Sequence, residues 1–231
     1  MWKALSISRE QQADDWGYNM KNIKIDFMSV GSLGTNCYFV CNGDTMETVV
    51  VDPGADAAKI VARIEQKQYH PVAVFLTHAH FDHMMAAREI CDRYGIRLCM
   101  YEEETELAGD PDANLSTSFM GPYYVDADET FKDNQTVTIA GFDIKVLHTP
   151  GHTKGSCCFY LEEENILLSG DTLFCQSVGR SDFPTGSTAQ LLRSIGERLF
   201  TLPDDTAVYP GHGEATTIGY EKVHNCCAGM V

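Results

Sequence analysis

The sequence predicts an α+β fold in which two β-sheets pack face to face and helices cover their outer faces. Two observations predict this fold. Apolar or alternating runs of strand length come first in each half of the chain, and a segment with helical spacing follows them. Since the two halves repeat this order, each sheet can bury one face against the other sheet and its second face under helices.

The first half of the chain combines short predicted strands with two longer helices. Residues 23–27 alternate apolar and polar side chains, as a half-buried strand does. Segment 55–68 has helical spacing, with Ile60, Val61 and Ile64 on one face. The other elements predicted here are strands 37–40, 48–51, 72–76 and 97–100, a helix over 84–94 with core positions Met85, Ile90 and Tyr94, and a short acidic helix over 102–107 with a solvated face.

A long irregular stretch, residues 109–128, separates the two halves. A loop of this length in a compact domain is typical of a lid or a binding loop. The alternative is a surface excursion whose aromatic residues pack locally, and the sequence leaves both open. The elements predicted after it are strands 136–139, 143–147, 156–161, 166–169 and 206–209, a helix over 188–200 with Leu191, Leu192, Ile195 and Leu199 on one side, and a closing helix over 218–224.

The composition excludes several classes of partner. The 231 residues carry a net charge of −16, whereas nucleic acids and anionic membrane surfaces require clustered Lys and Arg. No run approaches the ~20 apolar residues of a membrane span. Nine cysteines, an odd number without a visible signal peptide, predict free thiols and a cytoplasmic protein. We expect residues 1–19 to be a loose extension and residues 20–231 to form one domain, and the oligomeric state stays open.

The densest group of chemistry-bearing side chains follows the apolar run 72–76. His78, His80, Asp82 and His83 fall within six residues. Alternate residues of a strand share a face, so the first two histidines can point the same way while Asp82 and His83 reach a different point in space. Imidazole and carboxylate ligands suit zinc, iron or manganese. Burying these polar groups side by side without a metal is costly, so the spacing predicts two adjacent metal positions.

Three later strand ends also carry candidate ligands, each in a turn that contains glycine. At these ends lie His148 and His152, then Asp171, then His212. Glycine lets the backbone approach a crowded site closely. Each turn alone is a weak signal, because a Gly-His pair is usually just a turn. Four strand ends of this kind in one chain are hard to explain as ordinary turns.

The ordered set of these residues resembles the metallo-β-lactamase superfamily over roughly residues 23–224. All seven motif positions match in order, as His78-x-His80-x-Asp82-His83 followed by His152, Asp171 and His212. The resemblance implies a four-layer αβ/βα sandwich with its metal site at one edge of the two sheets. It also implies a first metal held by His78, His80 and His152, a second held by Asp82, His83 and His212, and Asp171 bridging both.

Within this superfamily the chain is most similar to the glyoxalase II-like hydrolases of the small bacterial branch. Segment 179–187 is similar to that branch, and class B β-lactamases generally lack an aspartate at the position of Asp171, which disfavours antibiotic hydrolysis. We expect no C-terminal helical domain of the kind that helps glyoxalase II bind glutathione. Gly213 and Glu214 stand where a Glu-Tyr pair is usual. The thiol of the substrate is therefore open.

The resemblance implies a binuclear hydrolase in which a bridging hydroxide attacks a thioester carbonyl, such as that of a small-molecule hydroxyacyl thiol. Two divalent ions would be the cofactors, zinc first and iron or manganese as alternatives. Asp82 and Asp171 are the candidate catalytic residues. Arg180 is the candidate anchor for a substrate carboxylate, because its fork of donors matches a carboxylate. Tyr123 and Tyr124 are candidate substrate contacts.

Three alternatives to thioester hydrolysis remain open from the sequence. A mononuclear iron persulfide dioxygenase keeps most of the same ligands, and a lactonase uses the same set. A non-catalytic metal-binding protein is a third reading, which absence of any turnover would support. The ligand motif alone does not separate these activities.

Overall fold

The computed structural model describes residues 22–231, and the extension expected over residues 1–19 lies outside the described residues. Within this part of the chain the first sheet runs in the order β1-β2-β3-β4-β5-β6. The first three strands pair antiparallel, and β3 to β6 pair parallel. The bounds are β1 Ile23–Val30, β2 Thr35–Asn42, β3 Glu47–Val51, β4 His70–Phe75, β5 Arg97–Tyr101 and β6 Glu129–Phe131.

The second sheet has the order β14-β13-β10-β9-β8-β7. Its neighbours pair antiparallel except β10 and β13, which are parallel because helix α6 (Thr188–Ser194) crosses over between them. The hairpin β11 (Leu173–Phe174) and β12 (Ser177–Val178) follows β10. The sheet strands are β7 Thr136–Ile139, β8 Phe142–His148, β9 Cys157–Leu161, β10 Ile166–Gly170, β13 Ala207–Pro210 and β14 Thr216–Thr217.

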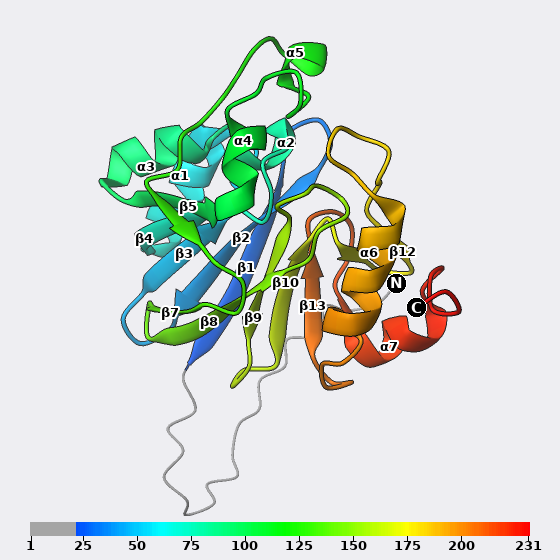
Figure 1. Ribbon diagram of the computed structural model, residues 1–231. Helices are drawn as coiled ribbons and strands as arrows, with labels where there is room; N and C mark the ends of the chain where they lie inside the picture. The colour runs from blue at the N-terminus through cyan, green and yellow to red at the C-terminus, as the bar shows by residue number, and fades with distance from the viewer. Residues whose placement is uncertain (1–21) are drawn as a thin grey trace, which may run out of the picture.

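The sheets and helices form four layers, which confirms the αβ/βα sandwich (Figure 1). Phe75, Phe142 and Phe159 are buried between the sheets, where Phe75 and Phe159 lie 5.2 Å apart. Helices α1 (Ala57–Lys67) and α3 (Ala87–Tyr94) cover the outer face of the first sheet, and α6 and α7 (Ile218–His224) cover that of the second. The strand ends are therefore fixed by apolar packing on both faces of each sheet.

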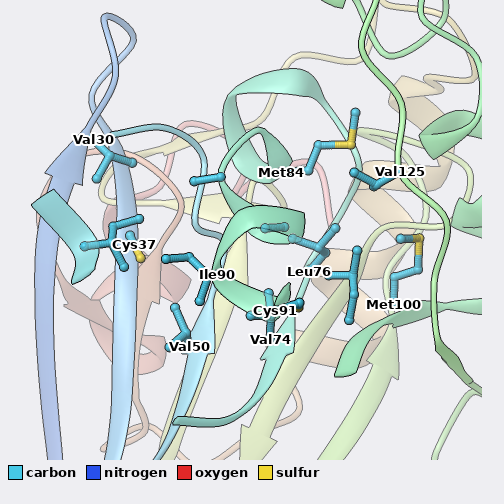
Figure 2. Packing of buried hydrophobic residues seen from close by; sticks show 14 of the residues in the cluster. Val30, Cys37, Val50, Val74, Leu76, Met84, Ile90, Cys91, Met100 and Val125 are labelled. Carbon is cyan, nitrogen blue, oxygen red and sulfur yellow. The ribbon is translucent and has the colours of Figure 1, made fainter. Parts of the chain in front are cut away.

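The core under α3 is shown in Figure 2. Val50 and Val74 project from adjacent strands toward Ile90 and Cys91 of the helix, and all four are buried. Burying an aliphatic side chain of this size contributes about 1.5–3 kcal/mol. This packing holds the end of β4, from which the histidine cluster starts.

The helix predicted over residues 84–94 is confirmed over residues 87–94 as α3, but its predicted start is wrong. The chain forms a short turn of helix α2 (Phe81–Met84) and then α3, because Ala86 N–H donates to Pro53 O instead of continuing the first helix. Met84 is fully buried, whereas Met85, the predicted core position, is only partly buried. The helix predicted over 188–200 also differs, because α6 passes into a π-helical segment η2 (Ile195–Leu199). Its apolar side is nevertheless buried at Leu191 and Ile195.

The acidic segment 102–107 is not simply a solvated face. It forms a 3₁₀ turn η1 (Glu102–Glu104) and a helical turn α4 (Thr105–Ala108), and Glu104 is 1% exposed. The long stretch 109–128 contains one further helical turn, α5 (Ser116–Phe119). The short strands β6, β11, β12 and β14 were not predicted, because two or three residues leave no clear period.

The nine cysteines are all free thiols, as predicted. No helix within residues 22–231 is both long and apolar enough to cross a bilayer.

Candidate metal centre

The histidine cluster begins at His78, three residues after Phe75, the last residue of β4. Leu76 N–H still donates to Cys99 O of β5, so the chain leaves the sheet only at Thr77. His80 is extended and precedes α2, whose first turn carries Asp82 and His83. The first two histidines are therefore presented by extended backbone and the last two ligands by a helical turn, which sends the two pairs to different points.

The first group of converging ligand atoms comes from His78, His80 and His152. His152 Nε2 lies 3.1 Å from His78 Nε2 and 2.9 Å from His80 Nδ1. Two nitrogens bound at 2.0–2.1 Å to a tetrahedral zinc are about 3.3 Å apart. All three side chains are buried. The loop after β4 and the loop after β8 thus meet in a triad with the spacing of metal ligands.

The second group comes from Asp82, His83 and His212. His212 Nε2 lies 3.3 Å from His83 Nε2 and 3.3 Å from Asp82 Oδ2. These separations again match ligands around one ion. His212 is brought here by β13, and Asn36 N–H of β2 donates to Gly211 O at 2.7 Å, which ties the two sheets together beside it.

Asp171 lies between the two groups. Its Oδ2 is 3.5 Å from His152 Nε2 and 3.6 Å from His212 Nε2, and its Oδ1 is 3.4 Å from His83 Nε2. The Oδ1 atom is buried without a hydrogen-bond partner. Leaving a buried carboxylate oxygen unpaired costs free energy unless a cation completes its surroundings. The donor set therefore fits two metal ions bridged by Asp171.

The protonation of the cluster agrees with a cation site. Burial holds the pKa of His78, His80 and His152 below the ordinary histidine value, so these imidazoles are neutral, as metal ligands must be. Burial would also lower the pKa of His83, but the nearby carboxylates of Asp171, Asp82 and Asp52 raise it to about 10. A positive charge is thus favoured where the second group converges.

Several side chains and backbone groups orient the ligands. His83 Nδ1–H donates to Asp52 Oδ2 at 3.0 Å, which leaves Nε2 free to face the centre. His152 Nδ1–H donates to Arg180 O at 2.6 Å, and Thr35 Oγ1–H donates to Asp82 Oδ2 at 2.9 Å. Such partners fix the tautomer and direction of a ligand.

Asp52 was not singled out by sequence reasoning. It follows β3 directly and also accepts hydrogen bonds from Thr77 N–H at 2.8 Å and Thr77 Oγ1–H at 2.7 Å. It is 1% exposed. The signal that could have found it is the same one that found the ligands, an acidic residue at the end of an apolar strand.

Glycine at position 211 is required by the crowding around the centre. A Cβ there would lie 2.2 Å from Asp171 Oδ1 and 2.8 Å from His83 Cε1. The turn before His212 can therefore approach the bridging carboxylate only because residue 211 has no side chain.

His148 is not part of the cluster, although it lies in the same predicted turn as His152. Its ring stacks on Tyr101 with centroids 4.3 Å apart, and its Nε2 lies 2.9 Å from Lys154 O. Tyr123 packs against the core under α3, and Tyr124 is 63% exposed. The substrate-binding roles of Tyr123 and Tyr124 stay predictions.

The Arg180 side chain lies at the surface beside the first group. Its guanidinium donates to both carboxylate oxygens of Asp182, at 3.0 and 2.8 Å, and sits 4.1 Å from the centroid of the Phe183 ring. That ring contacts His80, with centroids 5.5 Å apart. On the other side of the centre, a cavity beside His212 is lined by Phe174, Cys175, Gly213 and Glu214.

Comparison with known proteins agrees with this geometry. A hydroxyacylglutathione hydrolase, GloC of Haemophilus influenzae, is 32% identical over 207 residues, which cover 88% of this chain and 97% of that protein. The crystal structure of the BLEG-1 B3 metallo-β-lactamase is 38% identical with a TM-score of 0.84, covering 88% of this chain and 98% of that one. The structure of TTHA1623 in a di-iron-bound form is 32% identical with a TM-score of 0.77, covering 87% and 98%.

The sequence model of the metallo-beta-lactamase superfamily matches residues 30–212, a range that contains all seven converging ligands. The match includes strands of both sheets, and the four-layer arrangement is that of the metallo-β-lactamase fold. The chain belongs to the metallo-β-lactamase superfamily.

Proposed function

We propose that the protein is a binuclear metal-dependent hydrolase that cleaves thioesters of hydroxyacyl thiols. The observation that carries this proposal is the position of Asp171 between two complete triads of ligands. When bound, a pair of metal ions lowers the pKa of a coordinated water and polarises a carbonyl oxygen. His78, His80 and His152 would hold one ion, and the remaining triad would hold the other.

The carboxylate of Asp82 is suited to orient a water as well as to hold metal. Burial would raise its pKa, but His83 and His212 hold the pKa of Asp82 below the ordinary value, so it is ionised at neutral pH. Thr35 Oγ1–H donates to its Oδ2, which fixes the direction of the carboxylate. Oriented acceptors of this kind position a nucleophile.

A thioester suits the site because a thiolate leaves without a strong general acid. The relative named hydroxyacylglutathione hydrolase supports this substrate class. Glutathione itself is less well supported, since Gly213 and Glu214 stand where the glyoxalase II group usually has Glu-Tyr. We therefore propose a hydroxyacyl thioester without assigning its thiol, and zinc as the first metal to test, with iron next because a similar structure is described as di-iron-bound.

The test combines metal analysis with a substrate panel. The protein is purified without added metal, its metal content per chain is measured, and thiol release from hydroxyacyl thioesters is followed. We expect two ions per chain and thiol release that Asp171→Asn reduces at least 100-fold. Asp143→Asn, an exposed aspartate on β8, is the matched control and should retain full activity.

The other outcomes separate the alternatives. One iron per chain with oxygen uptake on a persulfide substrate would identify a dioxygenase instead. Hydrolysis of lactones or of a chromogenic cephalosporin, without thiol release from any thioester, would identify a different hydrolase. Absence of any turnover in a protein that holds two metal ions per chain would overturn the proposal.

A further inference from the structure

Glu104 is a buried carboxyl group that the proposed chemistry does not use. It ends the turn η1, is 1% exposed, and lies between loops of the two sheets. Its neighbours Glu102 and Glu103 on the same turn are exposed. Lys, Arg, Asp and Glu are almost never fully buried without a partner, so the partners of Glu104 indicate its role.

The Glu104 carboxylate accepts hydrogen bonds from both loops that carry the first triad. Its Oε1 accepts from Ala79 N–H at 2.8 Å, and Ala79 stands between His78 and His80. Thr153 Oγ1–H, beside His152, lies 2.9 Å from each carboxylate oxygen. The backbone N–H of Gly155 donates to the same carboxylate.

The neighbouring groups pack closely around the Glu104 carboxylate. A Cβ on Gly155 would lie 2.5 Å from Glu104 Oε2, so the backbone of the second loop packs directly on the carboxylate. Two of the three partners are backbone N–H groups, which can only donate. An amide in place of the carboxylate would turn one NH₂ group toward these donors and lose at least one hydrogen bond.

We propose that Glu104 is a positioning residue that fixes the distance between the two loops bearing His78, His80 and His152, and so sets the geometry of the first metal position. The separations of 2.9 and 3.1 Å within this triad depend on the relative placement of a loop from each sheet. A carboxylate hydrogen-bonded to both loops holds that placement. The inference rests on the metal centre of the proposed function but not on its substrate.

The chain offers a matched control in a second fully buried glutamate, Glu221 of α7. Its Oε2 accepts from Gln176 N–H at 2.8 Å and from Asn225 Nδ2–H at 2.7 Å, and its Oε1 accepts from Thr216 Oγ1–H at 2.6 Å. None of these partners belongs to the loops of the first triad. Replacing either glutamate with glutamine makes the same chemical change at the same degree of burial.

The experiment measures zinc affinity at each position separately, by competition with a chromophoric chelator. His212→Ala isolates the first triad, and His152→Ala isolates the second. In the His212→Ala background, where only the first triad is intact, we expect Glu104→Gln to weaken zinc binding about 10–100-fold. This is the range typical for loss of a partner that orients metal ligands. In the His152→Ala background, where only the second triad is intact, we expect Glu104→Gln to change zinc affinity less than threefold. Glu221→Gln should leave affinity in the first background within threefold.

Co²⁺ binding gives a second readout, because its absorption bands report ligand geometry. In the first background Glu104→Gln should change these bands, and Glu221→Gln should not. Equal losses at both metal positions, or an equal effect of both glutamate variants, would show a general structural role and overturn the proposal. If Glu104→Gln does not fold, Thr153→Val removes one hydrogen bond of the same network and should weaken the first position in the same direction. Intact metal affinities with no thioester hydrolysis would contradict the proposed substrate alone.

Discussion

Asp52 Oδ2 lies 3.0 Å from His83 Nδ1, and both side chains are almost fully buried. The carboxylate can only accept, so Nδ1 carries a proton, and a metal ion can displace only the second proton, the one on Nε2. Nε2 is the atom that faces His212 and Asp171. A residue that follows β3 thus orients the imidazole of a candidate ligand on α2.

Asp52→Asn should therefore weaken the second metal position. Since Thr77 N–H can only donate, the amide oxygen would keep the Oδ1 position and the NH₂ group would face His83 Nδ1, which favours the tautomer with hydrogen on Nε2, and that tautomer cannot bind metal through Nε2. We expect a 10–100-fold loss of zinc affinity there, measured by chelator competition in the His152→Ala background. Asp44→Asn, at an exposed turn, is the control. Unchanged affinity in Asp52→Asn would contradict the assigned tautomer.

Gly211→Ala should abolish binding of the bridged metal pair. The new Cβ would meet Asp171 Oδ1 at 2.2 Å and His83 Cε1 at 2.8 Å, so either the turn or both ligands must move. We expect fewer than two zinc ions per chain by elemental analysis and a loss of activity of at least 100-fold.

Gly213→Ala is the matched control for this prediction, two residues away. Gly213 has φ +80°, so alanine is strained there by about 1–2 kcal/mol, but nothing lies within 4 Å of its Cβ. This variant should lose stability and keep both metals. If it lost metal as completely as Gly211→Ala, backbone strain rather than contact with Asp171 would explain both.

The cluster of candidate ligands could be predicted because its members lie in turns within a few residues of the ends of apolar strands. The run before His78 and the run before His212 are local patterns, and strands that end at the same edge bring their turns together. The two sheets and their outer helices could also be predicted, because the apolar periodicity of strands and helices is a local pattern. The bounds of β3 and β4 differ from the predicted strands by only one or two residues.

The residues that orient the ligands could not be predicted in the same way. Glu104 lies in a run of acidic residues that looks solvated, and its burial depends on a loop about fifty residues later. The break between α2 and α3 depends on Pro53 O, which accepts from Ala86 N–H. The burial of Glu104 and the break between α2 and α3 both depend on contacts between distant segments of the chain. Local periodicity gives no information about such contacts.

The pH dependence of stability should show the cost of the buried Glu104 carboxylate. Burial raises its pKa from 4.5 to about 7, although three hydrogen-bond donors oppose the shift. The folded protein therefore holds a proton that the unfolded chain has lost, and this contribution to stability is present below pH 4.5 and lost as the pH rises through 7.

The comparison of metal-free wild type with metal-free Glu104→Gln isolates this effect, since the histidines are common to both. Between pH 5 and pH 8 the free energy of unfolding of wild type should fall by about 2 kcal/mol relative to the variant. Chemical denaturation at both pH values measures it, and Glu103→Gln controls for the loss of one carboxyl on the same turn. If the difference in unfolding free energy between wild type and Glu104→Gln were the same at both pH values, Glu104 would not titrate in this range.

Arg180→Ala should raise KM selectively for substrates that carry a carboxylate. The Arg180 side chain is 65% exposed, and Asp182 and the Phe183 ring hold its guanidinium beside the first triad. Loss of one hydrogen bond from a charged donor to a carboxylate is expected to raise KM about tenfold. The kcat should change less than threefold, because Arg180 lies outside the ligand cluster. Steady-state kinetics on acidic and neutral thioesters of equal length test this, with Arg193→Ala on α6 as the control. Equal effects on both substrates would mean that the residue acts through its carbonyl and His152 rather than as an anchor.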